Sequence, residues 1–154
     1  RIGCICSKNK EFMSTIMKFA QARLCAPTIE MIGAAALVNT AKEYFDDVHH
    51  EYQKRRDIVY NALKNMPGVV CEKPMGAFYV VAKLPLDNAE DFAKWMLTDF
   101  NIDNATTMVA PAAGFYATPG LGKDEVRLAY ILKEEDLVAA MDILAKGIEA
   151  YNNR

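Results

Sequence analysis

The start of the chain combines a short apolar run with a helical pattern. Apolar side chains stand close together in residues 1–6, which predicts a strand with Cys4 and Cys6 on one side. In residues 9–24 they recur every four positions, at Phe12, Ile16, Ala20 and Leu24. Because Asn9 can accept a backbone N–H at the start of this segment, we predict a helix over residues 9–24.

A much longer helical pattern follows Pro27. It begins at Thr28, a residue type that caps helices, and keeps one apolar face as far as residues 66–68. A helix of about 40 residues would be roughly 55 Å long, which is more than one small domain needs. We therefore predict a connecting helix that spans two lobes or bends partway along its length.

After Gly68 the apolar positions change from helical spacing to alternation. Alternation predicts strands over residues 69–72 and 77–84, and a helix follows from its cap, Asn88. Strands over residues 106–110 and 125–132 precede a last helix with apolar positions at Leu137, Met141, Leu144, Ile148 and Tyr151. The order ββαββα is that of an α+β fold, with helices covering a small antiparallel or mixed sheet.

Composition and charge narrow the class of protein. The 154 residues are 52% hydrophobic and 25% charged, as in an ordinary globular domain, and we expect a core centred on Phe78, Val80, Phe92, Trp95, Leu128, Met141 and Leu144. A net charge of −2 argues against a nucleic-acid partner. The longest apolar stretch, residues 31–38, is far shorter than the roughly 20 residues that cross a bilayer, so no membrane partner is expected.

The four cysteines lack the paired spacing of a zinc site, and no secretory signal precedes them. We therefore expect a reduced, cytoplasmic setting. Cys4 and Cys6 are interpreted as small buried hydrophobic residues rather than metal ligands.

Arg127 is the first candidate for binding chemistry. Alternation puts it, with Ala129 and Ile131, on the strand face opposite Val126 and Leu128. A guanidinium among apolar neighbours needs a partner, and its planar fork suits a carboxylate in two-point geometry. The alternative is an arginine that reaches solvent or pairs with a protein carboxylate. Taken alone, the residue favours that alternative, because most arginines are exposed.

Residues 111–124 are rich in Pro and Gly and carry Phe115 and Tyr116 in their middle. Long loops inside compact domains are often binding loops, and this one leads directly to Arg127. A plain surface excursion is the alternative.

Other polar clusters give no catalytic assignment. His49 and His50 are adjacent on a predicted helix and point about 100° apart, so they do not suit one metal. The acids at residues 46–47 and 134–136 lie at helix-surface positions. With no nucleophile beside a base and no metal-ligand cluster, the sequence predicts no self-contained active site and no metal.

Four segments together resemble a known enzyme family. They are Arg1-Ile2-Gly3, the Ala26-Pro27-Thr28 break, Pro74-x-Gly76-Ala77-Phe78-Tyr79 and Val126-Arg127-Leu128-Ala129-Tyr130. In this order, over essentially the whole chain, they resemble the C-terminal part of class I and II aminotransferases. These are the fold-type I, aspartate-aminotransferase-like enzymes that use pyridoxal phosphate.

The resemblance implies a function for two arginines. It places Arg1 a few residues after the Schiff-base lysine, in contact with the cofactor phosphate, and assigns the substrate α-carboxylate to Arg127. This reverses the preference drawn from Arg127 alone. The implied parent enzyme is a homodimer that exchanges an amino group between an amino acid and a 2-oxo acid. No catalytic residue is assigned within this chain, because the Schiff-base lysine belongs upstream, so the chain alone is expected to be inactive.

The resemblance also implies a division of the chain. Residues 1–27 would be a strand and helix of a large cofactor-binding domain, and residues 28–154 a connecting helix and small C-terminal domain. Because the first residues have the pattern of a strand with no cap, we expect a piece of a longer protein.

Two other functions stay open on the sequence. One is a non-catalytic α+β module that binds an amino acid or a partner protein, and the other is a pyridoxal-phosphate-dependent lyase of the same fold. The family's common Phe-Gly before the last strand is replaced by residues 114–120, so the substrate side chain is not indicated.

Overall fold

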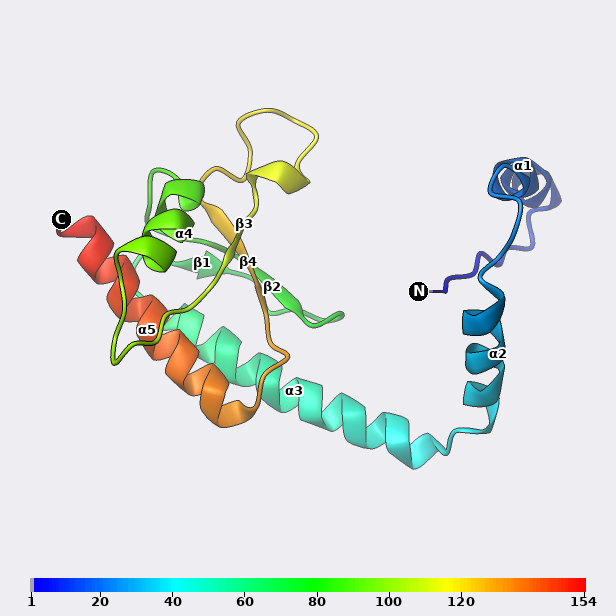
Figure 1. Cartoon of the computed structure of the whole chain (residues 1–154), viewed down its shortest axis with the longest axis horizontal. Coiled ribbons are helices and arrows are strands. Elements are labelled where there is room, and N and C mark those ends of the chain that lie inside the picture. The colour runs from blue at the N-terminus through cyan, green and yellow to red at the C-terminus, as the bar shows by residue number, and fades with distance from the viewer. Residues whose placement is uncertain (1) are drawn as a thin grey trace. The chain divides into compact units, whose positions relative to one another are not determined.

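A computed structural model describes residues 2–154 (Figure 1). The chain forms two compact units, one ending at Asp46 and the other running Asp47–Arg154. The border between them falls inside helix α3 (Lys42–Lys64). The division after residue 27 concerns the lobes of a parent enzyme and stays a prediction.

The second unit has the predicted order of elements after Gly68. They are β1 (Val70–Cys71), β2 (Tyr79–Lys83), α4 (Ala89–Thr98), β3 (Ala110–Pro111), β4 (Glu125–Ala129) and α5 (Glu134–Asn152), with a short 3-10 turn, η2 (Ala113–Phe115), before β4. The strands form one antiparallel sheet in the order β1-β2-β4-β3, which confirms the α+β prediction.

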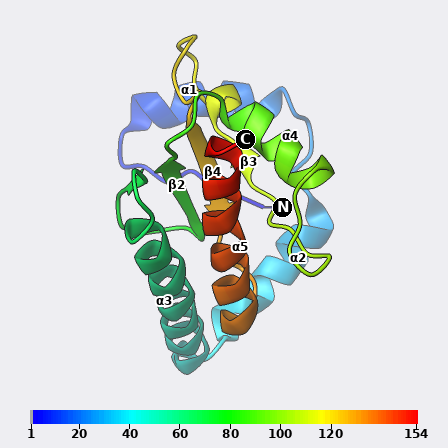
Figure 2. The same cartoon turned by 90° about the vertical axis from the view of Figure 1, so that its left-hand side faces the viewer.

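Helices cover one face of this sheet. Figure 2 shows α3 and α5 side by side, with α5 passing in front of β4. Burial alternates along β2 and β4, so every second side chain enters the core. The core joins side chains of all three helices to both strands, among them Leu63, Phe92 and Leu144 of the helices and Val80, Val126 and Leu128 of the strands.

The opposite face of β2 and β4 carries a different set of side chains. Tyr79, Val81 and Lys83 alternate with the buried residues of β2, and Glu125, Arg127 and Ala129 do so in β4. None of these six residues belongs to the buried core of the second unit. We call this surface the open face.

Asparagine caps set the starts of two helices. The side chain of Asn9 accepts the backbone N–H of Phe12 at 3.0 Å, and that of Asn88 accepts from Glu90 at 2.9 Å. Helices α1 (Lys10–Gln21) and α4 therefore begin as predicted.

Several element ends differ from the prediction. Residues 106–109 are not a strand, because the hydroxyls of Thr106 and Thr107 donate to the backbone carbonyls of Met96 and Ala140 and hold this segment against the helices. Strand β2 starts two residues late, since Ala77 has a left-handed φ of 56°.

Two aromatic side chains of the predicted core are not buried. Phe78 is 41% exposed and lies just before β2, and Trp95 packs only at the edge of the core. The remaining five residues of the predicted core are buried, namely Val80, Phe92, Leu128, Met141 and Leu144.

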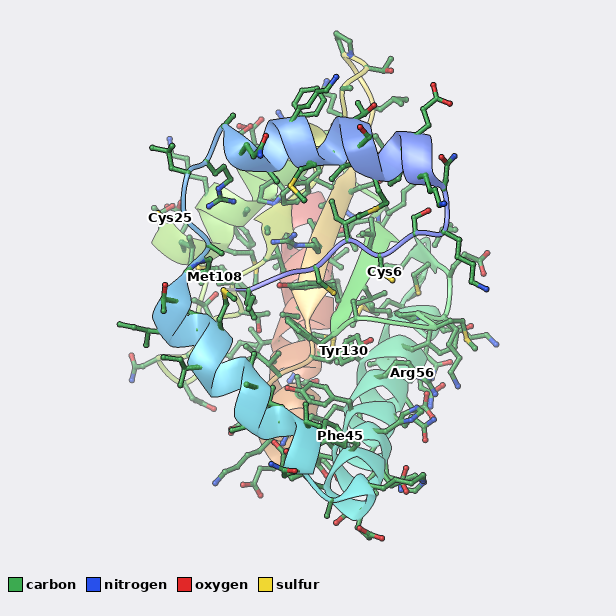
Figure 3. All side chains as sticks on the ribbon, turned by 90° about the vertical axis from the view of Figure 1, so that its right-hand side faces the viewer. Cys6, Cys25, Phe45, Arg56, Met108 and Tyr130 are labelled. Carbon is green, nitrogen blue, oxygen red and sulfur yellow. The ribbon has the colours of Figure 1, made fainter. Side chains whose placement is uncertain are left out.

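The first unit has helices without a core. It holds α1, α2 (Thr28–Ala36) and a short 3-10 turn (Leu37–Asn39), and none of residues 2–46 is buried. Residues 2–6 form no strand and both Cys4 and Cys6 are exposed, so the predicted strand and the predicted burial of these cysteines are wrong. Cys6 precedes α1 and Cys25 lies between α1 and α2 (Figure 3).

The predicted 40-residue helix is also interrupted. Between α2 and α3 the chain passes through the 3-10 turn, and Thr40 is extended, with ψ of 130°. Val38, Asn39 and Thr40 are poor helix formers, because branched or short polar side chains disfavour the helical backbone. Among residues 2–154, no helix has both the length and the apolar composition of a membrane span.

Candidate carboxylate-binding site

Arg127 lies in the middle of the sheet on its open face. Strand β4 pairs with β2 on one side and β3 on the other, and the residues opposite Arg127 are Val81 and Ala110. Both neighbours are uncharged, so neither offers a counter-ion. Pairing on both sides fixes the backbone of Arg127. Its half-buried side chain is therefore attached to a rigid part of the sheet.

Two aromatic rings contact the guanidinium of Arg127. Its Cζ atom lies 4.5 Å from the ring centroid of Tyr79 and 4.4 Å from that of Phe115. Tyr79 stands opposite Ala129 in the register, and the small alanine leaves room for the ring to reach diagonally toward Arg127. A guanidinium directs its N–H donors in its own plane, so stacking against rings does not consume them.

The acids that precede Arg127 are bound by other groups. Glu125 accepts a hydrogen bond from the hydroxyl of Tyr116, and Asp124 pairs with Lys83 at 2.9 Å. Within residues 2–154, Arg127 itself has no ion pair and no side-chain hydrogen bond. The alternative in which it pairs with a protein carboxylate therefore finds no partner in the described part of the chain.

The loop that leads to β4 supplies one of the two rings. Its 3-10 turn, Ala113–Phe115, brings Phe115 over Arg127, and the next residue, Tyr116, reaches Glu125. Gly122 has φ of 69°, and a Cβ there would lie 2.5 Å from the Tyr116 ring. The hydrogen bond to the Glu125 carboxylate raises the pKa of Tyr116 above its usual value.

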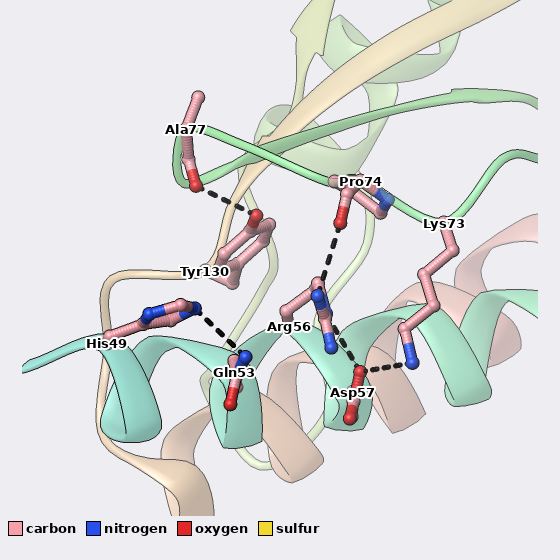
Figure 4. Close-up of polar contacts among 8 residues, drawn as sticks. All are labelled: His49, Gln53, Arg56, Asp57, Lys73, Pro74, Ala77 and Tyr130. Atoms are coloured by element: carbon pink, nitrogen blue, oxygen red, sulfur yellow. Dashed lines mark hydrogen bonds and ion pairs between the residues drawn. The ribbon is translucent and has the colours of Figure 1, made fainter. Parts of the chain in front are cut away.

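A second polar cluster joins α3 to the segment between β1 and β2. The Asp57 carboxylate accepts from Arg56 Nε at 2.8 Å and pairs with Lys73 Nζ at 2.9 Å, and Arg56 also donates to the carbonyl of Pro74 (Figure 4). The hydrogen bond from Arg56, and then that from Lys73, hold the pKa of Asp57 below its usual range.

Buried Tyr130 also contacts the segment between β1 and β2. Its hydroxyl donates to the carbonyl of Ala77 at 3.0 Å, next to the start of β2 (Figure 4). Burial raises the pKa of Tyr130. Sequence reasoning missed this cluster, because Arg56 and Asp57 look like part of a charged helix face and nothing in their spacing points to Lys73 or Pro74.

The remaining predicted site residues play no part in this arrangement. Arg1, expected to contact a cofactor phosphate, lies outside the described residues. His49 shares a hydrogen bond with Gln53 one turn along α3, at 2.9 Å. Residues 2–154 contain no cluster of three His, Cys, Asp or Glu side chains that could hold a metal ion.

Comparison with known proteins identifies relatives over most of the chain. The sequence profile described as "Aminotransferase class I and II" matches residues 1–144. An aspartate aminotransferase of Musicola paradisiaca is 32% identical over 160 aligned positions, which cover 99% of this chain and 37% of that protein.

Solved structures agree with this match. An alanine aminotransferase from Pyrococcus furiosus superposes with a TM-score of 0.71 at 28% identity, covering 93% of this chain and 36% of that one. A kynurenine aminotransferase from Pyrococcus horikoshii, solved with PMP, has a TM-score of 0.76 over 93% of this chain and 35% of its own, and at 19% identity it shows the fold alone. The chain spans between 35% and 37% of the length of these three proteins.

Proposed function

The chain belongs to the class I and II aminotransferase family, and from this premise we propose that it is the C-terminal part of an amino acid:2-oxo acid aminotransferase that uses pyridoxal 5'-phosphate. In this proposal Arg127 binds the α-carboxylate of the substrate. The two relatives reported above with at least 28% identity are both aminotransferases, which favours amino-group exchange over lyase chemistry. A homodimer and a cytoplasmic location are further predictions of the same proposal.

One observation carries the function proposed for Arg127. Its guanidinium lies on the open face with two aromatic contacts and, in the described part of the chain, without an anionic partner. The two rings restrict the guanidinium to few orientations, while its in-plane donors stay available for a carboxylate in two-point geometry. A guanidinium that is held in position but has no anionic partner among residues 2–154 supports recognition of an anion from outside the chain.

The chemistry needs this orientation. When bound, the cofactor acts as an electron sink, so that an amino acid gives up its amino group and leaves as a 2-oxo acid, and a second 2-oxo acid takes the amino group up. By fixing the carboxylate, Arg127 sets which bond at the α-carbon faces the reacting groups.

Four lysines of residues 2–154 have carboxylate partners. They are Lys42, Lys73, Lys83 and Lys146, each of which forms an ion pair with an aspartate. Arg1, the only residue to which the resemblance gives a cofactor contact, lies outside the described range.

The first test is Arg127→Lys in the complete protein that carries this chain. Lysine keeps the charge but loses the planar fork, so binding and orientation should both suffer. A hydrogen bond to a charged group is worth about 1.5 to 3 kcal/mol, so kcat/KM should fall at least roughly tenfold, measured by steady-state kinetics.

Arg154→Lys is the matched control. Arg154 also contacts aromatic rings, with its Cζ 3.5 Å from the ring centroid of Tyr151, but it lies at the end of the chain, after α5. We expect its kcat/KM to equal that of the wild type. An unchanged kcat/KM in Arg127→Lys, together with a lower melting temperature, would contradict the binding function.

A further inference from the structure

The proposed carboxylate site has an internal competitor. Glu125 and Arg127 are two residues apart on the same face of β4, which separates their Cα atoms by roughly 7 Å. Both side chains are long enough to meet across that distance, and their charges are opposite. A Glu125–Arg127 pair would occupy the donors that a substrate carboxylate needs.

That pair does not form in the structure. The Glu125 carboxylate instead accepts a hydrogen bond from the Tyr116 hydroxyl at 2.5 Å. Hydrogen bonds to a charged acceptor are short and roughly twice as strong as neutral ones. A tyrosine hydroxyl keeps its proton at neutral pH and is therefore available as a donor, and the hydrogen bond to Glu125 raises the pKa of Tyr116 further.

The position of Tyr116 is built into the loop. Its ring occupies the space beside Gly122, where any Cβ would lie 2.5 Å from ring carbons, and Gly122 adopts a left-handed φ. The carbonyl of Gly122 accepts the backbone N–H of Glu125 at 3.2 Å. The ring, the glycine and the carboxylate thus form one local unit that holds the Tyr116 hydroxyl at Glu125.

The 3-10 turn before β4 and the residue after it contact both Arg127 and Glu125. Phe115 ends the 3-10 turn and contacts the Arg127 guanidinium, and the next residue, Tyr116, binds Glu125. Two adjacent aromatic residues therefore contact a cation and an anion on the same face of β4.

We propose that Tyr116 is a positioning residue for substrate binding, whose hydroxyl keeps Glu125 away from Arg127 and so leaves the guanidinium free for the substrate carboxylate. This inference rests on the function proposed above for Arg127. To the proposed site it adds Tyr116, which does not touch the substrate, and Glu125, whose carboxylate must stay away from Arg127.

Tyr116→Phe tests the proposal, since it removes only the hydroxyl. In the complete protein, Glu125 then competes for Arg127, so KM for the amino acid should rise about two- to fivefold, the range expected for an exposed ion pair, with little change in kcat. The double variant Tyr116→Phe/Glu125→Gln removes the competing charge and should restore the wild-type KM. A merely structural function for Tyr116 predicts no such rescue.

A second readout needs no turnover. In the 154-residue chain, the NMR signal of the Arg127 Nε–H should shift in Tyr116→Phe, as the guanidinium gains a carboxylate partner, and return in the double variant. An unchanged signal and an unchanged KM in Tyr116→Phe would overturn the proposal, as would a double variant as impaired as the single one.

Parallel kinetics of Arg127→Lys separate the two claims. A loss in Arg127→Lys with wild-type behaviour of Tyr116→Phe overturns only the function of Tyr116. Wild-type kinetics of Arg127→Lys overturn the function of Arg127, on which the inference rests.

Discussion

At the scale of single residues, Arg127 differs from the charged residues around it in the kind of partner it has. Asp124 pairs with Lys83, Asp57 with Arg56 and Lys73, and Glu125 accepts from Tyr116. Arg127 is left with aromatic contacts in the described part of the chain. Rings can hold a guanidinium without neutralising it, which suits a site that must bind an anion from outside.

The Asp57 cluster predicts a specific dependence of stability on pH. Because the pKa of Asp57 is lowered in the folded chain, its contribution is present above about pH 4 and is lost as pH falls through the folded pKa. In Asp57→Asn this contribution is missing at neutral pH, so its unfolding free energy should fall less between pH 7 and pH 3 than that of the wild type.

Urea unfolding followed by fluorescence of Trp95, the only tryptophan, measures this difference in the second unit. Asp47→Asn is the control, since Asp47 is an exposed carboxylate of α3 with no ion pair among residues 2–154. The unfolding free energy of Asp47→Asn should fall between pH 7 and pH 3 by the same amount as that of the wild type. If the unfolding free energy falls with pH equally in Asp57→Asn and in the wild type, the contacts of Asp57 with Arg56 and Lys73 do not stabilise the fold.

Some of the site could be predicted from single positions and some could not. Alternation along β4 predicts that Arg127 leaves the core, because side chains of a strand point to opposite faces. The contacts with Tyr79 and Phe115 depend on strand register and on the course of residues 112–124, which no local spacing encodes. The Tyr116–Glu125 bond was missed for the same reason.

At the scale of elements, helices α3, α4 and α5 hold the sheet from one side. Leu63 of α3 is fully buried in the shared core, whereas Leu97 of α4 is 55% exposed. Replacing Leu63 by Ala removes buried carbon and leaves a cavity, so we expect a loss of about 2 to 5 kcal/mol in urea unfolding.

Leu97→Ala makes the same chemical change at the surface, and its cost should stay within about 0.5 kcal/mol. Similar costs for the two variants would mean that α3 does not contribute to the core as described.

Local rules predicted the starts of helices better than the ends of strands. A cap such as Asn9 or Asn88 acts within three residues, so its effect is readable from the sequence. Strand ends depend on distant partners, as when Thr107 bonds to the carbonyl of Ala140 in α5 instead of joining a ladder. The helix break at residues 37–41 was only partly predictable, because Val38, Asn39 and Thr40 weaken a helix without forbidding it.

At the scale of the whole molecule, the two units differ in what stabilises them. The second unit has a continuous core, while residues 2–46 include no buried side chain and rely on local helix formation. Large apolar residues of the first unit, such as Phe19 and Ile32, are exposed. The family assignment rests on both units, since the profile match runs over residues 1–144.

The most direct test of the central claim measures binding of a substrate carboxylate to Arg127 by a thermodynamic cycle. In the complete protein, dissociation constants are measured for an amino acid substrate and for its carboxamide, in the wild type and in Arg127→Lys. We expect the wild type to prefer the acid to the amide by roughly tenfold or more, and Arg127→Lys to lose most of this preference. The same preference in both proteins would show that the carboxylate is bound elsewhere and would contradict a carboxylate-binding function of Arg127.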